Sequence, residues 1–364
     1  MIKDIRIKNF RCFNDLSVSG FEKINLISGK NNIGKTALLE AIFLNSAPRP
    51  DTIFLLRQVR REKASFSRSL PERTWNNFFF QQDKSNKILI ETTLENGVPK
   101  VIEVCVDEST KNFLENIDQQ DHEDEAKENI ISLFSGSESV VSVMRLKTRV
   151  GLEDVFETLI IASAKGLISR DIKVPDIKKT SFIPSFLRTS SRDLTEEFDK
   201  ARLNERKDEV LKAFQSIDPD IEDVESFSIG EPTIYLRREG EIRLPLSLFG
   251  DAVNRIADII LRIVNNENSI LLIDEIENGI HHSSQVYFWK VLYDLAHKLN
   301  VQIFATTHSL EMTQAFIEAG LDQQNLAAHF ELTKQFKTGK IVAIRRDLET
   351  LDYGISHKKE VRGE

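Results

Sequence analysis

The feature that most constrains the fold is a glycine-rich loop directly after an apolar run. The sequence L-I-S-G-K-N-N-I-G-K-T spans residues 26–36, and its last eight residues match the pattern G-x-x-x-x-G-K-[ST]. The apolar residues of 24–27 predict a strand before the loop, and residues 37–43 predict a helix after it, because they are good helix formers with an apolar face at helical spacing. A strand, a glycine loop and a helix in this order predict an α/β protein that binds phosphates.

The residue types of this loop suit the phosphates of ATP. Glycines let the backbone curl so that its N–H groups point at phosphate oxygens, and the helix that follows adds its positive end. Lys35 can reach the β- and γ-phosphates, and the Thr36 hydroxyl can ligate Mg²⁺. A glycine loop that occurs by chance is the alternative. The candidate ATP contacts are Gly29, Lys30, Asn31, Asn32, Ile33, Gly34, Lys35, Thr36 and Ala37.

Two carboxylates follow a second apolar strand. Residues 269–273 read S-I-L-L-I and end at Asp274 and Glu275, which places both acids at the carboxyl edge of a sheet, where nucleotides bind. We expect Asp274 to hold Mg²⁺, directly or through water, and Glu275 to act as the general base on the attacking water. Two acids after a strand are by themselves most often a solvated strand end. The phosphate loop upstream favours the functional interpretation.

A histidine follows the next predicted strand. Residues 301–305 are apolar and end at T-T-H-S, so His308 comes one helix and one strand after the acid pair. Because a neighbouring strand ends at the same edge of the sheet, His308 is predicted to reach the γ-phosphate. A structural role is the usual one for a lone histidine in such a place.

The rest of the sequence predicts further elements around the strand, loop and helix of the phosphate site. From residue 251 on, helical and strand patterns alternate, which indicates a mostly parallel sheet flanked by helices. We also expect an antiparallel β subdomain and a helical lobe, with hairpins that turn at Asn96-Gly97 and Glu239-Gly240, and a helix over 195–214. The predicted parts are the N-terminal head, an inserted lobe and the C-terminal head: residues 1–106, 107–224 and 225–364.

Composition narrows the class of protein. The net charge is −8, so contact with nucleic acid is possible only through a local basic patch such as residues 57–73, for which a solvated face with a few ion pairs is favoured. The acidic residues 107–128 predict a solvated helix or mobile loop. No apolar run is long enough for a bilayer span, and Cys12 and Cys105 have no metal-ligand spacing. A reduced, cytoplasmic protein without membrane contact is expected.

These elements, in this order, resemble the ABC-type ATPase heads of the SMC and RecF class. They are more closely similar to the bacterial ATPases grouped with the OLD (overcoming lysogenization defect) proteins. The opening I-R-I-K-N-F-R-C-F resembles the first strand of that class, with Arg11 near the nucleotide. D-E-I-E-N-G-I-H-H at 274–282 resembles the joined Walker B and D-loop of the OLD-like group, which makes Asn278 and His281 D-loop residues. T-T-H-S resembles its switch-histidine loop.

The resemblance also implies a signature segment and a glutamine loop. P-L-S-L-F-G-D-A-V-N-R at 245–255 lies where the class has the signature that closes over the ATP of another subunit, so Ser247 and Gly250 are the candidate contacts in trans. The spacing from serine to glycine is one residue longer than in L-S-G-G-Q, which puts the efficiency of ATP-driven closure in doubt. Gln82, with its neighbour Gln81, is the candidate for the glutamine loop. Polar residues on a turn are the alternative for both.

The function that the resemblance implies is an ATPase that dimerises around ATP and Mg²⁺. As a homodimer or higher homo-oligomer, it would act as sensor or regulator for a separately encoded effector, a nuclease or toxin, in bacterial anti-phage defence. One alternative is a RecF-like DNA repair ATPase, and another is a binding module in which ATP is structural. No intrinsic nuclease is expected, because the sequence shows no second acidic metal cluster and too few residues after His308 for the TOPRIM domain of full OLD proteins.

Overall fold

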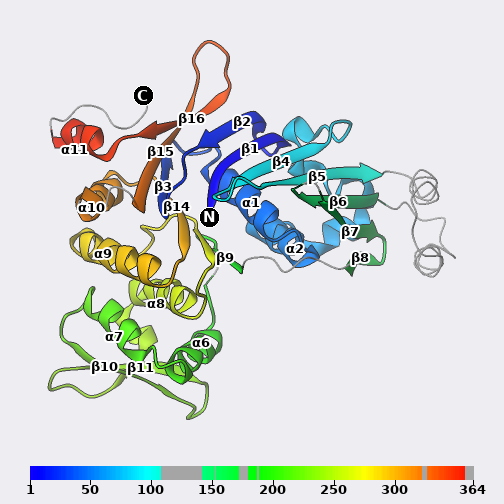
Figure 1. Cartoon of the computed structure of the whole chain (residues 1–364). Helices are drawn as coiled ribbons and strands as arrows, with labels where there is room; N and C mark the ends of the chain where they lie inside the picture. Colours follow the sequence, from blue (N-terminus) through cyan, green and yellow to red (C-terminus); the bar gives the residue numbers. More distant parts are fainter. Residues whose placement is uncertain (108–141, 152, 172–178, 187, 322–325, 357–364) are drawn as a thin grey trace. The chain divides into compact units, whose positions relative to one another are not determined.

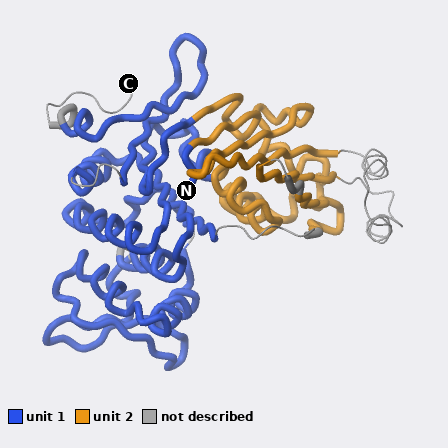
Figure 2. Tube along the Cα trace, viewed as in Figure 1, with its two compact units in different colours: residues 1–3, 18–39, 178–364 blue, residues 4–17, 40–177 orange. Residues whose placement is uncertain are grey.

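The computed structural model describes the chain except for residues 108–141, 152, 172–178, 187, 322–325 and 357–364 (Figure 1). The described residues form two compact units, each built from segments that are distant in sequence (Figure 2). Unit 1 comprises residues 1–3, 18–39 and 178–364, and unit 2 comprises residues 4–17 and 40–177. The predicted division into residues 1–106, 107–224 and 225–364 stays a prediction.

Unit 1 is built on a mostly parallel sheet. Its strand order is β16-β15-β3-β14-β13-β9, in which β16 pairs antiparallel with β15 and the other neighbours pair in parallel. The short apolar strands are buried on both faces, as expected for a parallel sheet between helices. The strands are β3 (Ile24–Gly29), β9 (Thr180–Ile183), β13 (Ile270–Ile273), β14 (Gln302–Thr306), β15 (Ala327–Lys334) and β16 (Ile341–Arg346).

Helices accompany these strands in unit 1 (Figure 1). They are α8 (Asp251–Val264), α9 (His282–Lys298), α10 (Leu310–Gly320) and α11 (Leu348–Ser356), while α1 (Lys35–Ser46) begins in unit 1 and ends in unit 2. Trp289 of α9 packs edge-on against Phe316 of α10, with ring centroids 4.9 Å apart. The Trp289 indole N–H also points at the Met312 sulfur, 2.9 Å away, so the buried ring keeps a polar partner. The α/β architecture predicted from the sequence is confirmed.

A lobe of unit 1 combines two helices with a small antiparallel sheet. The helices are α6 (Ser191–Leu203) and α7 (Lys207–Gln215), and the sheet holds β10 (Ile221–Phe227), β11 (Thr233–Arg238) and β12 (Leu244–Pro245). The hairpin predicted at Glu239-Gly240 is present, with Gly240 in the left-handed region at φ 69°. The single helix predicted over 195–214 is wrong. The chain breaks between α6 and α7, where Glu205 has φ 58°, a value outside helical geometry.

Unit 2 contains a larger, largely antiparallel sheet. Its strand order is β2-β1-β4-β5-β6-β7-β8, and consecutive strands from β4 to β8 pair antiparallel. The predicted hairpin at Asn96-Gly97 joins β4 to β5, and Gly97 has φ 77°. The strands are β1 (Ile2–Phe10), β2 (Phe13–Ser19), β4 (Ile88–Leu94), β5 (Pro99–Asp107), β6 (Ser142–Val150), β7 (Glu153–Ser163) and β8 (Gly166–Asp171).

Short helical segments complete the described chain. Helices α2 (Pro50–Val59) and α3 (Ala64–Ser69) lie in unit 2, followed there by 3-10 turns at Pro71–Arg73, Asn76–Phe78 and Phe80–Gln82; a further one spans Leu246–Phe249 in unit 1. Among the described residues, no helix is long and apolar enough to cross a membrane.

A buried ion-pair group lies in unit 2. The Glu40 side chain is fully buried and accepts hydrogen bonds from Arg11 Nε and Arg60 Nε, each at 2.7 Å. Arg11 Nη1 donates to the Asn77 carbonyl at 2.7 Å, and its guanidinium lies 4.3 Å from the centre of the Phe78 ring. Arg11 therefore has a structural environment of its own. Its predicted place near a nucleotide stays a prediction.

The basic stretch of residues 57–73 is partly used inside unit 2. Arg57 is buried, donates to Glu62 at 2.8 Å and lies over the Trp75 ring, so it is not available to a nucleic acid. Arg60 is paired with Glu40. These contacts agree with the favoured ion-pair interpretation. The acidic stretch of residues 107–128 lies, apart from Asp107, outside the described residues.

We predict that Glu40→Ala destabilises unit 2 by about 3–5 kcal/mol, because it leaves the buried Arg11 guanidinium without its carboxylate. Asp15→Ala is the matched control: the Arg6–Asp15 pair is 46% and 41% exposed, so its loss should cost less than about 1 kcal/mol. Denaturant unfolding followed by Trp75 fluorescence, in a Trp289→Phe background, reports unit 2. Equal losses in both variants would contradict the role given to Glu40.

Candidate active site

Three predicted segments meet at one edge of the unit 1 sheet. Strands β3, β14 and β13 are neighbours and run in parallel, with Ile27 opposite Thr306 and Ala305 opposite Ile273. Their carboxyl ends therefore lie side by side. The phosphate loop follows β3, the acid pair follows β13 and T-T-H-S follows β14. The parallel pairing alone brings these three loops together.

The phosphate loop has a backbone that requires glycine. Gly29 has φ 142°, and a Cβ there would lie 2.5 Å from the Leu332 carbonyl oxygen and 3.1 Å from the Ile33 side chain. Gly34 has φ 104° and Asn32 has φ 61°, so the loop curls in the way that lets its N–H groups converge. Helix α1 begins directly after it. A side chain at Gly29 would force the loop away from β15.

Lys35 is folded back onto the loop. Its Nζ donates to the carbonyls of Gly29 at 2.7 Å and Lys30 at 3.0 Å, and the residue is 9% exposed. Burial lowers the pKa of Lys35, while the nearby carboxylates of Glu277, Asp274 and Glu275, in that order, oppose this effect. Lys35 is thus a partly desolvated cation among acids, positioned to gain from an anionic ligand.

Asp274 is held between two hydroxyl groups. Thr36 Oγ1 lies 3.0 and 3.1 Å from the two Asp274 carboxylate oxygens, and Thr306 Oγ1 donates to Oδ1 at 2.7 Å. Hydroxyl and carboxylate oxygens are ligands that Mg²⁺ prefers, so Thr36 and Asp274 fit a magnesium site. Within the described part of the chain, no group of three or more His, Cys, Asp or Glu side chains could hold a metal. Phosphate and water would have to complete the coordination.

Glu275 has a strained backbone and a fixed side chain. Its φ is 51°, which is uncommon for a non-glycine residue and often found at functional sites. Its N–H donates to Thr306 Oγ1 at 2.9 Å, and its Oε2 accepts from Asn278 Nδ2 at 3.0 Å. Asn278, a predicted D-loop residue, also donates weakly to the Ser185 carbonyl at 3.4 Å. The structure therefore brings Asn278 next to the predicted base.

His308 pairs with an acid that the sequence analysis did not single out. Glu277 Oε1 lies 2.8 Å from His308 Nδ1 and accepts the His308 backbone N–H, also at 2.8 Å. The histidine ring is half exposed, whereas the Glu277 side chain is 9% exposed. The sequence signal for Glu277 was only a third acid two residues after Glu275. Once the strand has ended, alternation no longer predicts where such a side chain points.

The remaining D-loop candidate has a local structural contact. His281 is the N-cap of α9 and accepts the Ser283 N–H at 3.4 Å through Nδ1. Its side chain is exposed, and its ring lies 4.1 Å from the His282 ring, centroid to centroid, with the two planes tilted by 42°. A capping role explains the contacts that His281 makes in the described structure. Its predicted D-loop role stays a prediction.

The predicted signature segment is exposed in unit 1. Ser247 and Leu248 lie on the 3-10 turn before α8 with exposed side chains, and Gly250 has φ 88° directly before the helix. Arg255 of α8 connects this segment to the acid strand, because its Nη2 donates to the Asp274 carbonyl at 2.6 Å. Its Nη1 donates to the Pro184 carbonyl at 2.8 Å. Helix α8 is therefore tied to the end of β13, a link that the sequence did not predict.

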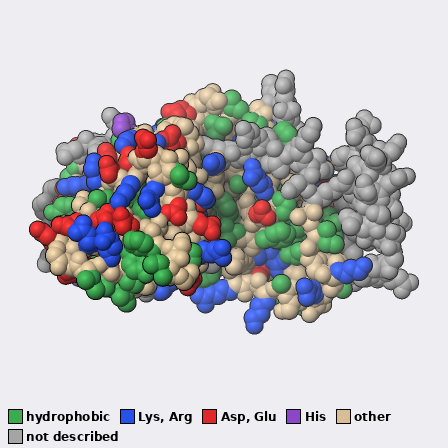
Figure 3. Space-filling view, turned by 90° about the horizontal axis from the view of Figure 1, so that it is seen from below, with side chains coloured by type: hydrophobic (Ala, Val, Ile, Leu, Met, Phe, Trp, Pro, Cys, Tyr) green, Lys and Arg blue, Asp and Glu red, His purple; other side chains and the backbone are tan. Residues whose placement is uncertain are grey.

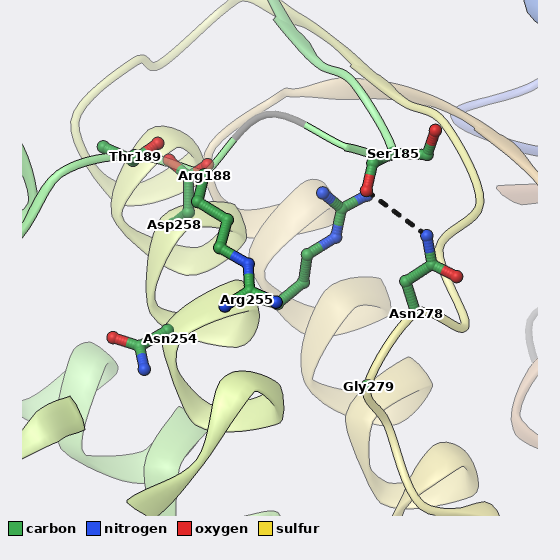
Figure 4. Close-up of a pocket in the computed structure, with 8 residues that line it drawn as sticks. All are labelled: Ser185, Arg188, Thr189, Asn254, Arg255, Asp258, Asn278 and Gly279. Carbon is green, nitrogen blue, oxygen red and sulfur yellow. Dashed lines mark hydrogen bonds between the residues drawn. The ribbon is translucent and has the colours of Figure 1, made fainter. Parts of the chain in front are cut away.

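A cavity of about 280 Å³ lies beside Arg255 (Figure 4). Figure 4 shows the Arg188 side chain reaching toward the stem of Arg255, whose own guanidinium points away toward Ser185, with the Asn278–Ser185 hydrogen bond nearby. Its walls come from α8, from the segment after β9 and from the loop after β13, and its lining residues are Ser185, Arg188, Thr189, Asn254, Arg255, Asp258, Asn278 and Gly279.

Gln82 lies in unit 2. It is exposed on a 3-10 turn with φ 61°, and its Nε2 donates to Asn77 Oδ1 at 3.4 Å. Gln81, also exposed, has φ 53°. These features agree with the alternative of polar residues on a turn. A glutamine-loop role for Gln82 stays a prediction.

Comparison with known proteins gives relatives along nearly the whole chain. An ATP/GTP phosphatase of Helicobacter pylori is 26% identical over 345 residues, which cover 89% of this chain and 88% of that protein. A DNA replication and repair protein RecF of Bacillus cytotoxicus is 46% identical over 43 residues, 12% of each chain. The solved SMC head bound to the C-winged helix domain of ScpA is 11% identical, covers 96% of this chain and 98% of its own, and has a TM-score of 0.49.

A family model also matches this chain. It is described as "AAA domain, putative AbiEii toxin, Type IV TA system" and matches residues 24–312. The match runs from the strand before the phosphate loop to the first turn of the helix after His308, so it includes all three loops of the candidate site. Because it covers most of the sequence, the chain belongs to this AAA-domain family and is an ATPase of the AAA class.

Proposed function

We propose that this chain binds ATP with Mg²⁺ at the carboxyl edge of the unit 1 sheet and hydrolyses it. The observation that carries the proposal is the contact of Thr36 Oγ1 with both carboxylate oxygens of Asp274, at 3.0 and 3.1 Å. It joins the phosphate loop to the acid strand, as Mg²⁺ coordination in P-loop ATPases requires. The name of the Helicobacter pylori relative, ATP/GTP phosphatase, supports the same chemistry.

Each residue has a distinct part in the proposed reaction. The loop N–H groups and Lys35 bind and orient the phosphates, while Thr36 and Asp274 would hold Mg²⁺, which neutralises charge on the phosphate oxygens. Glu275 accepts the proton of the attacking water, and Asn278 keeps its carboxylate in place through the 3.0 Å hydrogen bond. His308 contacts the γ-phosphate. These roles need small movements, since Lys35 must leave the carbonyls of Gly29 and Lys30.

We further propose a homodimer in which Ser247 and Gly250 of one subunit face the ATP of the other. The exposure of the turn before α8 supports this, because Ser247 is free to meet a partner and Leu248 is 68% exposed. Arg255 would link this contact to the site of its own subunit, since it binds the Asp274 carbonyl. A contact at the dimer interface could then change the position of Asp274 through Arg255.

The biological role that we propose is regulation of a separately encoded effector, a nuclease or toxin, in anti-phage defence. The family description, which names the AbiEii toxin and type IV TA systems, supports a role of this kind. The alternative of a RecF-like repair ATPase has support from a local match of 43 residues only. In Figure 3, basic and acidic side chains are interspersed on the face of unit 1 in view, without a large basic area that would favour nucleic acid there.

We predict that Lys35→Ala abolishes ATP binding, because the phosphates lose their positive partner in a partly desolvated site. Isothermal titration calorimetry with ATP and with GTP measures the loss. Lys337→Ala, which removes an exposed lysine from the turn between β15 and β16, is the matched control and should bind as the wild type does. Wild-type affinity in Lys35→Ala would refute the phosphate-loop interpretation.

Glu275→Gln is expected to bind ATP and Mg²⁺ normally but to hydrolyse ATP at least about a hundredfold more slowly, the scale of a lost general base. An ATP-bound dimer should accumulate, visible by size-exclusion chromatography with light scattering. Glu318→Gln, which changes an exposed acid on α10, serves as the control. Unchanged turnover in Glu275→Gln would show that another group takes the proton.

A mixed dimer tests the trans contact of Ser247. Neither Lys35→Ala nor Ser247→Arg homodimers should hydrolyse ATP, because the first lacks bound ATP and the second has a blocked signature. In a mixed dimer, the Ser247→Arg subunit binds ATP and meets the intact serine of its partner, so one of the two sites in each mixed dimer should hydrolyse ATP. Confirmed mixed dimers that hydrolyse nothing would speak against the contact in trans.

A further inference from the structure

We propose that Glu277 is a positioning residue that holds His308 by a carboxylate–histidine pair and so directs the Nε2 of the ring at the γ-phosphate. The effect on hydrolysis rests on the proposed function, whereas the pair itself does not. Glu277 is not part of the phosphate-loop motif, and the sequence analysis gives it no role.

One oxygen of Glu277 fixes two parts of His308. Oε1 lies 2.8 Å from the ring Nδ1 and accepts the backbone N–H of the same residue at 2.8 Å. The first contact fixes the rotation of the ring, and the second fixes the peptide that carries it. The Glu277 side chain is 9% exposed, whereas the His308 ring that it holds is half exposed. The backbone and the ring of His308 are thus both held by one carboxylate oxygen.

The pairing decides which ring nitrogen is left for a ligand. An ionised carboxylate only accepts hydrogen bonds, so the proton of a neutral imidazole must sit on Nδ1. Nε2 is then the ring nitrogen that Glu277 leaves for a ligand, and the His308 side chain is half exposed. A protonated imidazole donates through both nitrogens, so Nε2 of such a ring can donate to an anion. A phosphate oxygen at Nε2 and Glu277 at Nδ1 would enclose the ring between two negative groups.

The two acids of the D-E-I-E run serve different partners. The Glu275 carboxylate is bound by Asn278 at 3.0 Å, and Glu277 is bound by His308. The second oxygen of Glu277, Oε2, is buried and has no hydrogen-bond partner among the described residues. The hydrogen bonds that the structure gives this carboxylate are therefore those of Oε1 to His308. Glu277 is also the carboxylate with the largest opposing effect on the lowered pKa of Lys35, which places it in the same electrostatic group.

A purely structural clamp on the loop is the competing explanation, and the ring state of His308 distinguishes the two. Nuclear magnetic resonance of the full chain with ¹⁵N-labelled histidine, assigned by the loss of signals in His308→Gln, reports the tautomer without any nucleotide. We expect the proton on Nδ1 in the wild type and a shift to Nε2 in Glu277→Ala. A proton on Nε2 in the wild type, or no change in Glu277→Ala, would overturn the proposal.

A double-mutant cycle tests the effect on hydrolysis. Glu277→Ala should lower kcat about 10- to 100-fold, the scale for losing a group that orients a functional histidine, with an ATP Kd within about twofold of the wild type. In a His308→Ala background the same change should have no further effect, because Glu277 acts through the ring. Additive losses would show independent roles and overturn the proposal.

Two variants keep this test decisive. Glu277→Gln preserves the shape and an accepting oxygen, but its amide can also donate to Nδ1 and so no longer fixes the tautomer of the ring; it should fold normally and still lose at least about fivefold in kcat. Glu318→Ala on α10 controls for loss of an acid elsewhere. If Glu277→Gln turns over like the wild type, a clamp suffices and the proposal fails. If the wild-type chain hydrolyses no ATP, the proposed function fails, while the tautomer still decides the pair.

Discussion

The parallel pairing of β3, β14 and β13 is the constraint on which the candidate site depends. Each strand is short, apolar and buried, and each ends in a loop with polar side chains. With Ile27 opposite Thr306 and Ala305 opposite Ile273, the loops emerge at one edge. A slip of one residue in this register would turn Thr306 away from Asp274 and leave a buried carboxylate without its 2.7 Å donor. The apolar core therefore determines where the chemistry lies.

At this edge of the sheet, three carboxylates lie around the single lysine of the phosphate loop that points back onto it. Lys35 is 9% exposed and rests on carbonyl oxygens, while Asp274, Glu275 and Glu277 lie within its electrostatic reach. Thr36 and Thr306 satisfy the oxygens of Asp274 with neutral donors, which can yield to a cation. ATP with Mg²⁺ would bring a divalent cation to the acids and phosphate oxygens to Lys35. This complementarity is the physical basis of the proposal that ATP and metal bind together.

The sequence predicted three segments of this site but missed one of its acids, and both outcomes have physical causes. The phosphate loop, the acid pair and the histidine could be found because each follows an apolar strand. Glu277 could not, since periodicity ends with the strand. Glu40 has the sequence context of an exposed helical acid, yet it is fully buried because Arg11 and Arg60, distant in sequence, converge on it. The break at Glu205 has no Gly or Pro to signal it, so one long helix was predicted where the chain forms two.

We propose that the nucleotide and the metal share one site, at Thr36 and Asp274. Electron paramagnetic resonance with Mn²⁺ in place of Mg²⁺ tests this most directly, in titrations with and without a non-hydrolysable ATP analogue. We expect tight Mn²⁺ binding that requires the analogue, shows coupling to phosphorus and is lost in Asp274→Asn. The same Mn²⁺ affinity with and without the analogue, or in Asp274→Asn, would contradict it.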